Sequence, residues 1–119
     1  MTDFKIDKLT NNGIELLLLS GYLDAHTSPD LEEVFKNLLK EQKYKIVVNF
    51  KDLLYISSAG LGVFMAFIEE IRNNAGDIKF CCMTSKIFNV FDLLGFPLLY
   101  QIYETEPEAI EKFNVNQNN

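Results

Sequence analysis

The hydrophobic positions at the start of the chain predict a β-hairpin. Phe4 to Thr10 alternates loosely between apolar and polar residues, and Asn11-Asn12-Gly13 follows. Asn-Gly favours a tight turn because both residues tolerate positive φ. Ile14 to Leu19 is then the return strand, and its near-continuous leucines indicate that both faces of this strand are buried.

The pattern then changes to a helical period. Thr27-Ser28-Pro29-Asp30 is typical of a helix start, with a cap, a proline suited to the first turn and an acidic residue for the dipole. The apolar residues that follow at helical spacing are Leu31, Val34, Phe35, Leu38 and Leu39. Lys45 to Phe50 is predicted to be a buried strand, because it contains Ile46-Val47-Val48.

A second helix is predicted to begin at Ser57-Ser58 and to run to about Asn74. Its core-facing stripe consists of Leu61, Phe64, Ile68 and Ile71. The first two turns are apolar all round, which is more than one core-facing stripe requires. Either this end is covered on all sides, or part of it contacts a partner; Met65 and Phe67 are the residues suited to a partner surface.

The last third of the chain continues the alternation of strands and helices. Asp77 to Met83 is predicted to be a strand, and Ser85 to Leu94 a helix that ends at Gly95. The residues of this helix expected to face inward are Ile87, Val90, Phe91 and Leu94.

Leu98 to Tyr103 is predicted to be the last strand. Thr105-Glu106-Pro107-Glu108 predicts a capped final helix that runs through about Phe113. Residues 114–119 are polar and are expected to form a disordered tail. Strands separated by helices need crossover connections, so we predict one α/β domain over residues 1–113, with a mixed sheet of about five strands and about four helices.

Composition and charge narrow the function classes. The chain has 119 residues and a formal net charge of −6. This charge argues against nucleic acid and anionic membrane surfaces as partners. The longest apolar run, Leu61 to Ile68, is too short to span a bilayer, and no signal peptide is visible. We therefore expect a cytoplasmic protein, with no direct insertion into a membrane.

The two cysteines, Cys81 and Cys82, are adjacent. On a strand they would point to opposite faces, which suits neither a disulfide nor a metal site. We expect two buried thiols, and the sequence predicts no metal site and no cofactor. Gly60-x-Gly62 lacks the remainder of a phosphate-binding or dinucleotide motif, so Gly62 is expected to let the helix start pack closely.

The candidate chemistry lies at Ile56-Ser57-Ser58-Ala59-Gly60-Leu61-Gly62. These residues place two hydroxyls at a helix N-terminus, where backbone N–H groups are unpaired and the helix dipole favours an anion. The alternative is that Ser57 or Ser58 is simply an N-cap. The segment Gly21 to Thr27 is expected to lie beside this helix start, since sites gather at the carboxyl ends of parallel strands.

A hydrolase is the remaining alternative from the residues alone. His26 is the single histidine, and with Asp24 and Ser58 it would nominally form a Ser-His-Asp set. No motif enforces the hydrogen-bonded geometry that such a set needs. Asp24-Ala25-His26 is more typical of a strand-to-helix loop with a solvated histidine.

Two segments of the chain resemble the STAS domain, specifically the small stand-alone anti-sigma factor antagonists of bacteria. In that family a strand ends Gly-x-Leu-Asp before a Thr-containing cap, which Gly21-Tyr22-Leu23-Asp24-Ala25-His26-Thr27 matches. A later strand leads to Asp-Ser-Ser-Gly-Leu-Gly, whose first serine receives phosphate, and residues 56–62 align with it. Val90 to Gly95 and Glu108-Ala109-Ile110 also fit, so the resemblance covers nearly the whole chain.

The resemblance implies a STAS fold and a non-enzymatic regulator that works by partner switching. Ser58 takes the phosphorylated position, with Ser57 as the second choice; Ser57 replaces the family's aspartate and Ala59 its second serine. The residues expected to contact the partner are Asp24, His26, Thr27, Ser57, Ser58, Ala59, Gly60, Leu61, Gly62 and Met65.

The resemblance also implies the partners. The unphosphorylated protein would bind an anti-sigma factor that is an ATP-binding serine kinase of the GHKL type, which would free a sigma factor for transcription. Phosphorylation of Ser58 would release the protein, and a PP2C-type phosphatase would reset it. The free protein is expected to be a monomer. The alternative within the same family is a constitutive, non-phosphorylated interaction subunit of a larger signalling or lipid-transport assembly.

Overall fold

The chain folds into a five-stranded sheet with four α-helices and one 3₁₀ helix in the part that the structure describes. The computed structural model describes the backbone of residues 3–117 and the side chains of residues 3–114. The elements in chain order are β1 (Phe4–Asn11), β2 (Ile14–Leu23), α1 (Ser28–Lys40), β3 (Lys45–Ile56), α2 (Ser58–Asn73), β4 (Asp77–Cys81), α3 (Ser85–Leu93), η1 (Phe96–Leu98), β5 (Ile102–Tyr103) and α4 (Glu106–Gln117).

The sheet is mixed, as predicted. Its strand order is β1-β2-β3-β4-β5, with β1 antiparallel to β2 and every later neighbour parallel. Asn12 and Gly13 adopt φ values of 52° and 83°, which gives the predicted tight turn between β1 and β2. No helix among residues 3–117 is long and apolar enough to cross a membrane.

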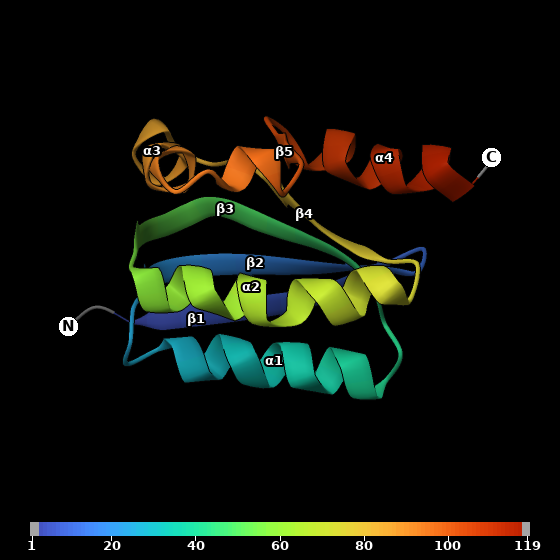
Figure 1. The fold of residues 1–119 in the computed structure, drawn as a ribbon, viewed down its shortest axis with the longest axis horizontal. Helices are drawn as coiled ribbons and strands as arrows, with labels where there is room; N and C mark the ends of the chain where they lie inside the picture. Colours follow the sequence, from blue (N-terminus) through green and yellow to red (C-terminus); the bar gives the residue numbers. More distant parts are fainter. Residues whose placement is uncertain (1–2, 118–119) are drawn as a thin grey trace.

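The helices cover both faces of the sheet. Residues of α1, α2 and α3 share one core with one face, and α4 packs on the other with a smaller apolar cluster. Helices α1 and α2 lie side by side along the sheet (Figure 1). On β2, Leu17 and Leu19 belong to the first core while Ile14 and Leu16 belong to the second. The predicted burial of both faces of this strand is therefore confirmed.

An aromatic cluster fills the larger core. Phe50 of β3 makes edge-to-face contacts with Phe80 and Phe91, at centroid distances of 5.2 and 5.3 Å. Phe64 of α2 contacts Phe80 at 5.0 Å. Such pairs contribute on the order of 1 kcal/mol each beyond their area burial, so they fix α2 and α3 against the sheet.

The two central strands are longer than predicted. β2 continues to Leu23 and β3 to Ile56, and the two strands pair up to Leu23 opposite Ile56. Register shifts near Leu18 and Gly21 interrupt the alternation, and the sequence pattern therefore hides the continuation. As a result β3 leads directly into α2.

The predicted strand over Leu98 to Tyr103 is wrong over most of its length. Gly95 adopts a left-handed conformation with φ 77°, and Phe96–Leu98 form a 3₁₀ turn after it. Only Ile102–Tyr103 pair with β4. The inward orientation expected for Leu94 is also wrong: α3 ends at Leu93, and the Leu94 side chain is exposed.

The predicted geometry of the two cysteines is wrong as well. β4 ends at Cys81, one position before Cys82, whose φ is 63°. This turn brings both side chains into the cluster beneath α4, instead of onto opposite faces. Cys81 is buried and Cys82 is half-buried, and both are free thiols. Burial raises the pKa of the Cys81 thiol far above its usual value.

The final helix is capped as predicted but ends later. The Glu108 N–H donates to Thr105 Oγ1 at 3.3 Å, and Glu108 Oε1 accepts from the Thr105 N–H at 3.3 Å, which is a capping box. α4 continues to Gln117, beyond the end predicted at about Phe113 and into the segment expected to be a tail. The last two residues of that segment lie outside the described residues.

Candidate functional site

The end of β2 and the start of α2 are joined directly. The Ser57 N–H donates to the Leu23 carbonyl at 2.9 Å, next to the pairing of Leu23 with Ile56. The rings of Tyr22 and Tyr55 lie 5.8 Å apart on the same two strands. The loop that follows Leu23 therefore lies beside the helix start, as the sequence predicts.

Gly60 holds the helix close to the strand. An added Cβ at this position would lie 2.7 Å from Leu23 Cγ and 3.1 Å from Ile56 Cγ1. At Gly62 an added Cβ would meet nothing within 4 Å. The close-packing role predicted for Gly62 therefore belongs to Gly60, and Gly62 leaves the exposed side of the helix open.

The two serines have different environments. Ser57 is the N-cap: its backbone is extended, and its Oγ accepts from the Gly60 N–H at 3.4 Å. Ser58 is the first residue of α2 and its side chain is exposed. No described residue forms a hydrogen bond with the Ser58 hydroxyl. The N-cap role thus falls to Ser57, which leaves the Ser58 hydroxyl accessible.

The start of α2 is suited to an anion. The first hydrogen bond along the helix runs from the Leu61 N–H to the Ser57 carbonyl at 3.1 Å. The N–H groups of the first turn have no acceptor further back along the helix, and the dipole is positive at this end. The first turn carries no acidic residue. A phosphate on Ser58 would meet this positive end without a carboxylate on the same turn.

The neighbouring loop is held by its own side chains. Thr27 Oγ1 donates to the Tyr22 carbonyl at 2.8 Å and accepts from the Asp24 N–H at 2.9 Å. Asp24 Oδ1 accepts from the N–H groups of His26 at 2.9 Å and Thr27 at 3.1 Å. Thr27 occupies the N-cap position of α1 but makes no capping hydrogen bond, so the predicted cap is wrong: its hydroxyl fixes the loop instead.

The carboxyl of Asp24 is stabilised in its ionised form. The hydrogen bond from the Thr27 backbone N–H is the largest cause that lowers the Asp24 pKa below its ordinary value, and the His26 N–H acts in the same direction. The loop therefore presents a carboxylate near the helix start at neutral pH.

The nominal Ser-His-Asp set has no hydrogen-bonded geometry. Asp24 accepts from the backbone of His26, and among the described residues no hydrogen bond joins the side chains of Ser58, His26 and Asp24. His26 is exposed in its loop, as predicted. Within residues 3–114, no group of three His, Cys, Asp or Glu residues is placed to hold a metal ion.

Some of the remaining residues predicted to contact a partner lie on the surface of α2, and others lie in the core. Met65 is 47% exposed, and Gly62 and Ala59 are also exposed. Gly60 and Leu61 are buried, on the side of the helix that faces the strands. Phe67 is half-buried and stacks on Phe35 at 5.4 Å. Phe67 thus packs against the core, whereas Met65 lies on the surface.

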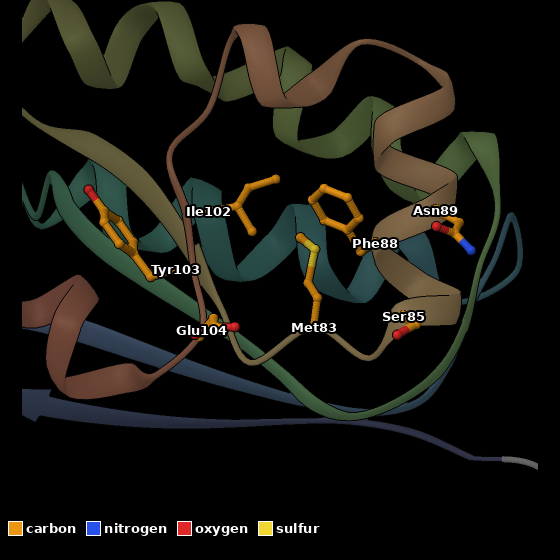
Figure 2. Close-up of a pocket in the computed structure, with 7 residues that line it drawn as sticks. All are labelled: Met83, Ser85, Phe88, Asn89, Ile102, Tyr103 and Glu104. Atoms are coloured by element: carbon orange, nitrogen blue, oxygen red, sulfur yellow. The ribbon is translucent and has the colours of Figure 1, made fainter.

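A separate cavity of about 320 Å³ lies between the ends of β4 and β5 and the start of α3. Figure 2 shows Met83, Phe88 and Ile102 pointing toward one another, with Ser85 and Asn89 to one side. The sequence did not predict this cavity, because its walls come from three elements and no motif marks it. None of the predicted site residues lines it.

Comparison with known families identifies the fold. The model of the STAS domain matches residues 5–109. The chain belongs to the STAS domain family. Among curated STAS relatives, the anti-sigma-B factor antagonist of Staphylococcus epidermidis is 28% identical over 107 residues, which cover 89% of this chain and 99% of that protein. The anti-sigma F factor antagonist of Paenibacillus polymyxa is 26% identical over 114 residues, which cover 95% and 97%.

Solved STAS structures share the fold. An anti-sigma factor antagonist from Mycobacterium paratuberculosis superimposes with a TM-score of 0.85 at 18% identity, covering 92% of this chain and 93% of that one. The Bacillus cell fate determinant SpoIIAA in its phosphorylated form gives a TM-score of 0.71 at 21% identity, covering 93% and 99%. The predicted STAS fold of a mixed sheet with flanking helices is confirmed.

Proposed function

We propose that this chain is an anti-sigma factor antagonist that is switched by phosphorylation of Ser58. Unphosphorylated, it binds an anti-sigma factor that is an ATP-binding serine kinase of the GHKL type, and so frees a sigma factor in the cytoplasm. The kinase phosphorylates Ser58 and thereby releases the antagonist, and a PP2C-type phosphatase restores the unphosphorylated form. The observation that carries this proposal is the exposed Ser58 hydroxyl at the start of α2, beside a Ser57 that already supplies the cap. The naming of the curated relatives as antagonists supports the same assignment.

A phosphate on Ser58 fits the free domain but not an apolar contact. It adds about −1.5 to −2 charges at neutral pH. At the helix N-terminus of the free protein the interaction with the dipole is favourable by on the order of 0.3–1 kcal/mol. When a protein partner covers Met65 and the open side of Gly62, the same phosphate loses its water without gaining a cation or hydrogen-bond donor in return. Each 1.4 kcal/mol of that penalty weakens binding about tenfold.

The surface around Ser58 also fits a protein partner. Gly62 and Met65 follow Ser58 at helical spacing on the exposed side of α2, and the loop of Asp24 and Thr27 borders the helix start. The fixed hydrogen bonds of that loop keep its shape on binding. We therefore place the contact for the anti-sigma factor on this helix face and this loop.

The deciding experiment compares three forms of the tagged protein in a pull-down from the native lysate, with mass spectrometry of the captured proteins and of Ser57 and Ser58. Wild type is expected to capture an ATP-binding kinase that leaves on addition of ATP, with phosphate on Ser58. Ser58→Asp is expected to lose this kinase, and Ser58→Ala to hold it in the presence of ATP. Release of Ser58→Ala by the kinase and ATP would refute the switch.

A second candidate is a constitutive STAS interaction subunit. The observation that favours it is Ser57, which stands where the family's phosphorylated motif has aspartate. In that case wild type and Ser58→Asp would hold the same partner, and neither serine would carry phosphate. Ser58 would then be only a solvent-exposed residue of the first helical turn.

A further inference from the structure

Four exposed leucines lie together at the end of α3 and in the turn after it. Leu93 and Leu98 are 85% and 90% exposed, and Leu94 and Leu99 are about half exposed. Residues 93–100 carry no charge, in a chain of which 24% is charged. We call Leu93, Leu94, Leu98 and Leu99 the leucine surface. A monomer gains nothing from exposing this much apolar side chain in one short segment.

The leucine surface is continuous with the face of α2 that begins at Ser58. The Tyr100 hydroxyl contacts Met65 Sδ at 3.5 Å, and Arg72 of α2 donates to the Leu99 carbonyl. Arg72 also lies over the Tyr100 ring, 5.4 Å from its centroid. The leucine segment is thereby attached to α2 at Met65, a large apolar side chain that is exposed on that helix. Ser58, Met65 and Arg72 lie on one face of α2 by their helical spacing, and the leucine segment is attached to this face at Met65 and Arg72.

We propose that the leucine surface is a second docking site for the same anti-sigma factor, and that it binds an uncharged, apolar part of that protein. This inference rests on the proposed function. A partner that covers Met65 from the Ser58 side reaches the leucine surface next, because the buried Tyr100 joins that segment to Met65. A second copy of this chain is the less favourable occupant, because two chains of net charge −6 repel each other.

The distance between the two parts of the surface has a consequence for regulation. Met65 is seven residues beyond Ser58, which is about 10 Å along a helix, and the leucines lie further away. A phosphate on Ser58 therefore does not contact the leucine surface. Docking on the leucine surface adds affinity before and after phosphorylation, whereas the contact at Ser58 is lost when Ser58 is phosphorylated. The leucine surface holds the substrate on the kinase without taking part in the transfer.

The test uses Leu98→Lys in the full chain, with Leu9→Lys as the matched control. Leu98 is exposed, so a lysine there leaves the core untouched. Leu9 is also exposed, at 56%, and lies on β1 at the far edge of the sheet from β5. With the purified anti-sigma factor kinase of the source organism, Leu98→Lys is expected to weaken binding tenfold to a hundredfold, and Leu9→Lys to leave it unchanged.

Phosphorylation kinetics distinguish docking from a disturbed site. Leu98→Lys is expected to raise KM for transfer to Ser58 with kcat unchanged. Its effect on Kd is expected to multiply with that of Ser58→Asp, because the two sites do not touch. Equal Kd values for wild type and Leu98→Lys, or a fall in kcat alone, would overturn the inference while the switch at Ser58 still stands.

Two further outcomes are decisive. If wild type sediments as a dimer that Leu98→Lys dissociates, and Kd for the kinase does not change, the occupant is a second copy and the inference is wrong. If wild type binds no kinase while its partner is an unrelated protein, the proposed function and this inference both fail.

Discussion

Substitution of Gly60 by alanine tests how closely α2 is held against β2. The new Cβ would lie 2.7 Å from Leu23 Cγ and 3.1 Å from Ile56 Cγ1. Leu23 is fully buried and Ile56 is 4% exposed, so neither side chain has solvent to move into. Either the start of α2 shifts away from the strands, or the core around Leu23 repacks.

The magnitude follows from two opposing effects. Overpacking a filled core costs about 1–3 kcal/mol. Replacing glycine by alanine in a helix returns about 0.5–1 kcal/mol, and less in the first turn. We expect Gly60→Ala to lower the free energy of unfolding by about 1–2 kcal/mol. Gly62→Ala is the matched control, because its Cβ meets nothing within 4 Å; it should raise the free energy of unfolding by about 0.5–1 kcal/mol.

Urea denaturation of wild type and the two variants, monitored by circular dichroism, measures both changes in the free energy of unfolding. The m-value is expected to be the same for all three proteins. In a thermal melt, each 1 kcal/mol corresponds to about 4 °C for a domain of this size. If Gly60→Ala and Gly62→Ala are equally stabilising, the contact between the helix start and Leu23 is not tight. The reasoning that a packed glycine positions Ser58 would then be refuted.

Three further predictions concern the site and its surroundings. Ser57→Ala removes the cap of α2 and should lower the free energy of unfolding, measured by urea denaturation, by about 0.5–1 kcal/mol. Ser58→Ala should change the free energy of unfolding by less than about 0.5 kcal/mol. Equal losses in the two variants would mean that Ser57 is not the cap. The pKa of Asp24 is lowered in the folded state, so its contribution to stability is present above its unfolded value and is lost as pH falls through the folded pKa. The His26 and Thr27 amide resonances should titrate with a midpoint below the ordinary value of 3.8, and a midpoint above 3.8 would contradict this. Burial raises the pKa of Tyr100 to about 12, so its neutral form stabilises the fold below the unfolded value of about 10, and this is lost as pH rises toward 12. Tyr100→Phe should lose less stability than wild type between pH 10 and 12 in thermal melts; parallel losses would show that Tyr100 does not titrate there.

The fold could largely be predicted because the local signals agree with the tertiary structure. Asn12-Gly13 closes the hairpin, Thr105 and Glu108 cap the last helix, and the leucines of β2 are buried on both faces. The sequence-based predictions were wrong where an apolar pattern does not determine which part of the fold its residues pack against. Leu98 and Leu99 look like the start of a strand, but the left-handed Gly95 turns the chain into a 3₁₀ helix that leaves them exposed.

The position of the candidate site in the fold was predictable, but its detailed geometry was not. The spacing of strands and helices put the loop after Leu23 next to the helix start, which the hydrogen bond from Ser57 to Leu23 confirms. Which serine caps the helix depends on the residue at which the extended backbone becomes helical, and the sequence offered both. Which glycine packs against the strands depends on which side of α2 is turned toward Leu23. This rotation of the helix is set by the tertiary structure and not by the local sequence. The predicted cap of α1 does not form, because the hydroxyl of Thr27, at the N-cap position, donates to the Tyr22 carbonyl in the loop instead.

The replacement of the family's aspartate by Ser57 has a physical consequence for the proposed switch. An aspartate at the N-cap would satisfy the Gly60 N–H as Ser57 does, but it would place a negative charge beside Ser58. A phosphate on Ser58 would be repelled by that charge in the free protein. With serine as the cap, the first turn of α2 has no acidic residue, and Asp24 is the carboxylate that borders it. The substitution therefore keeps the structural role of the cap and removes one negative charge from the position beside Ser58.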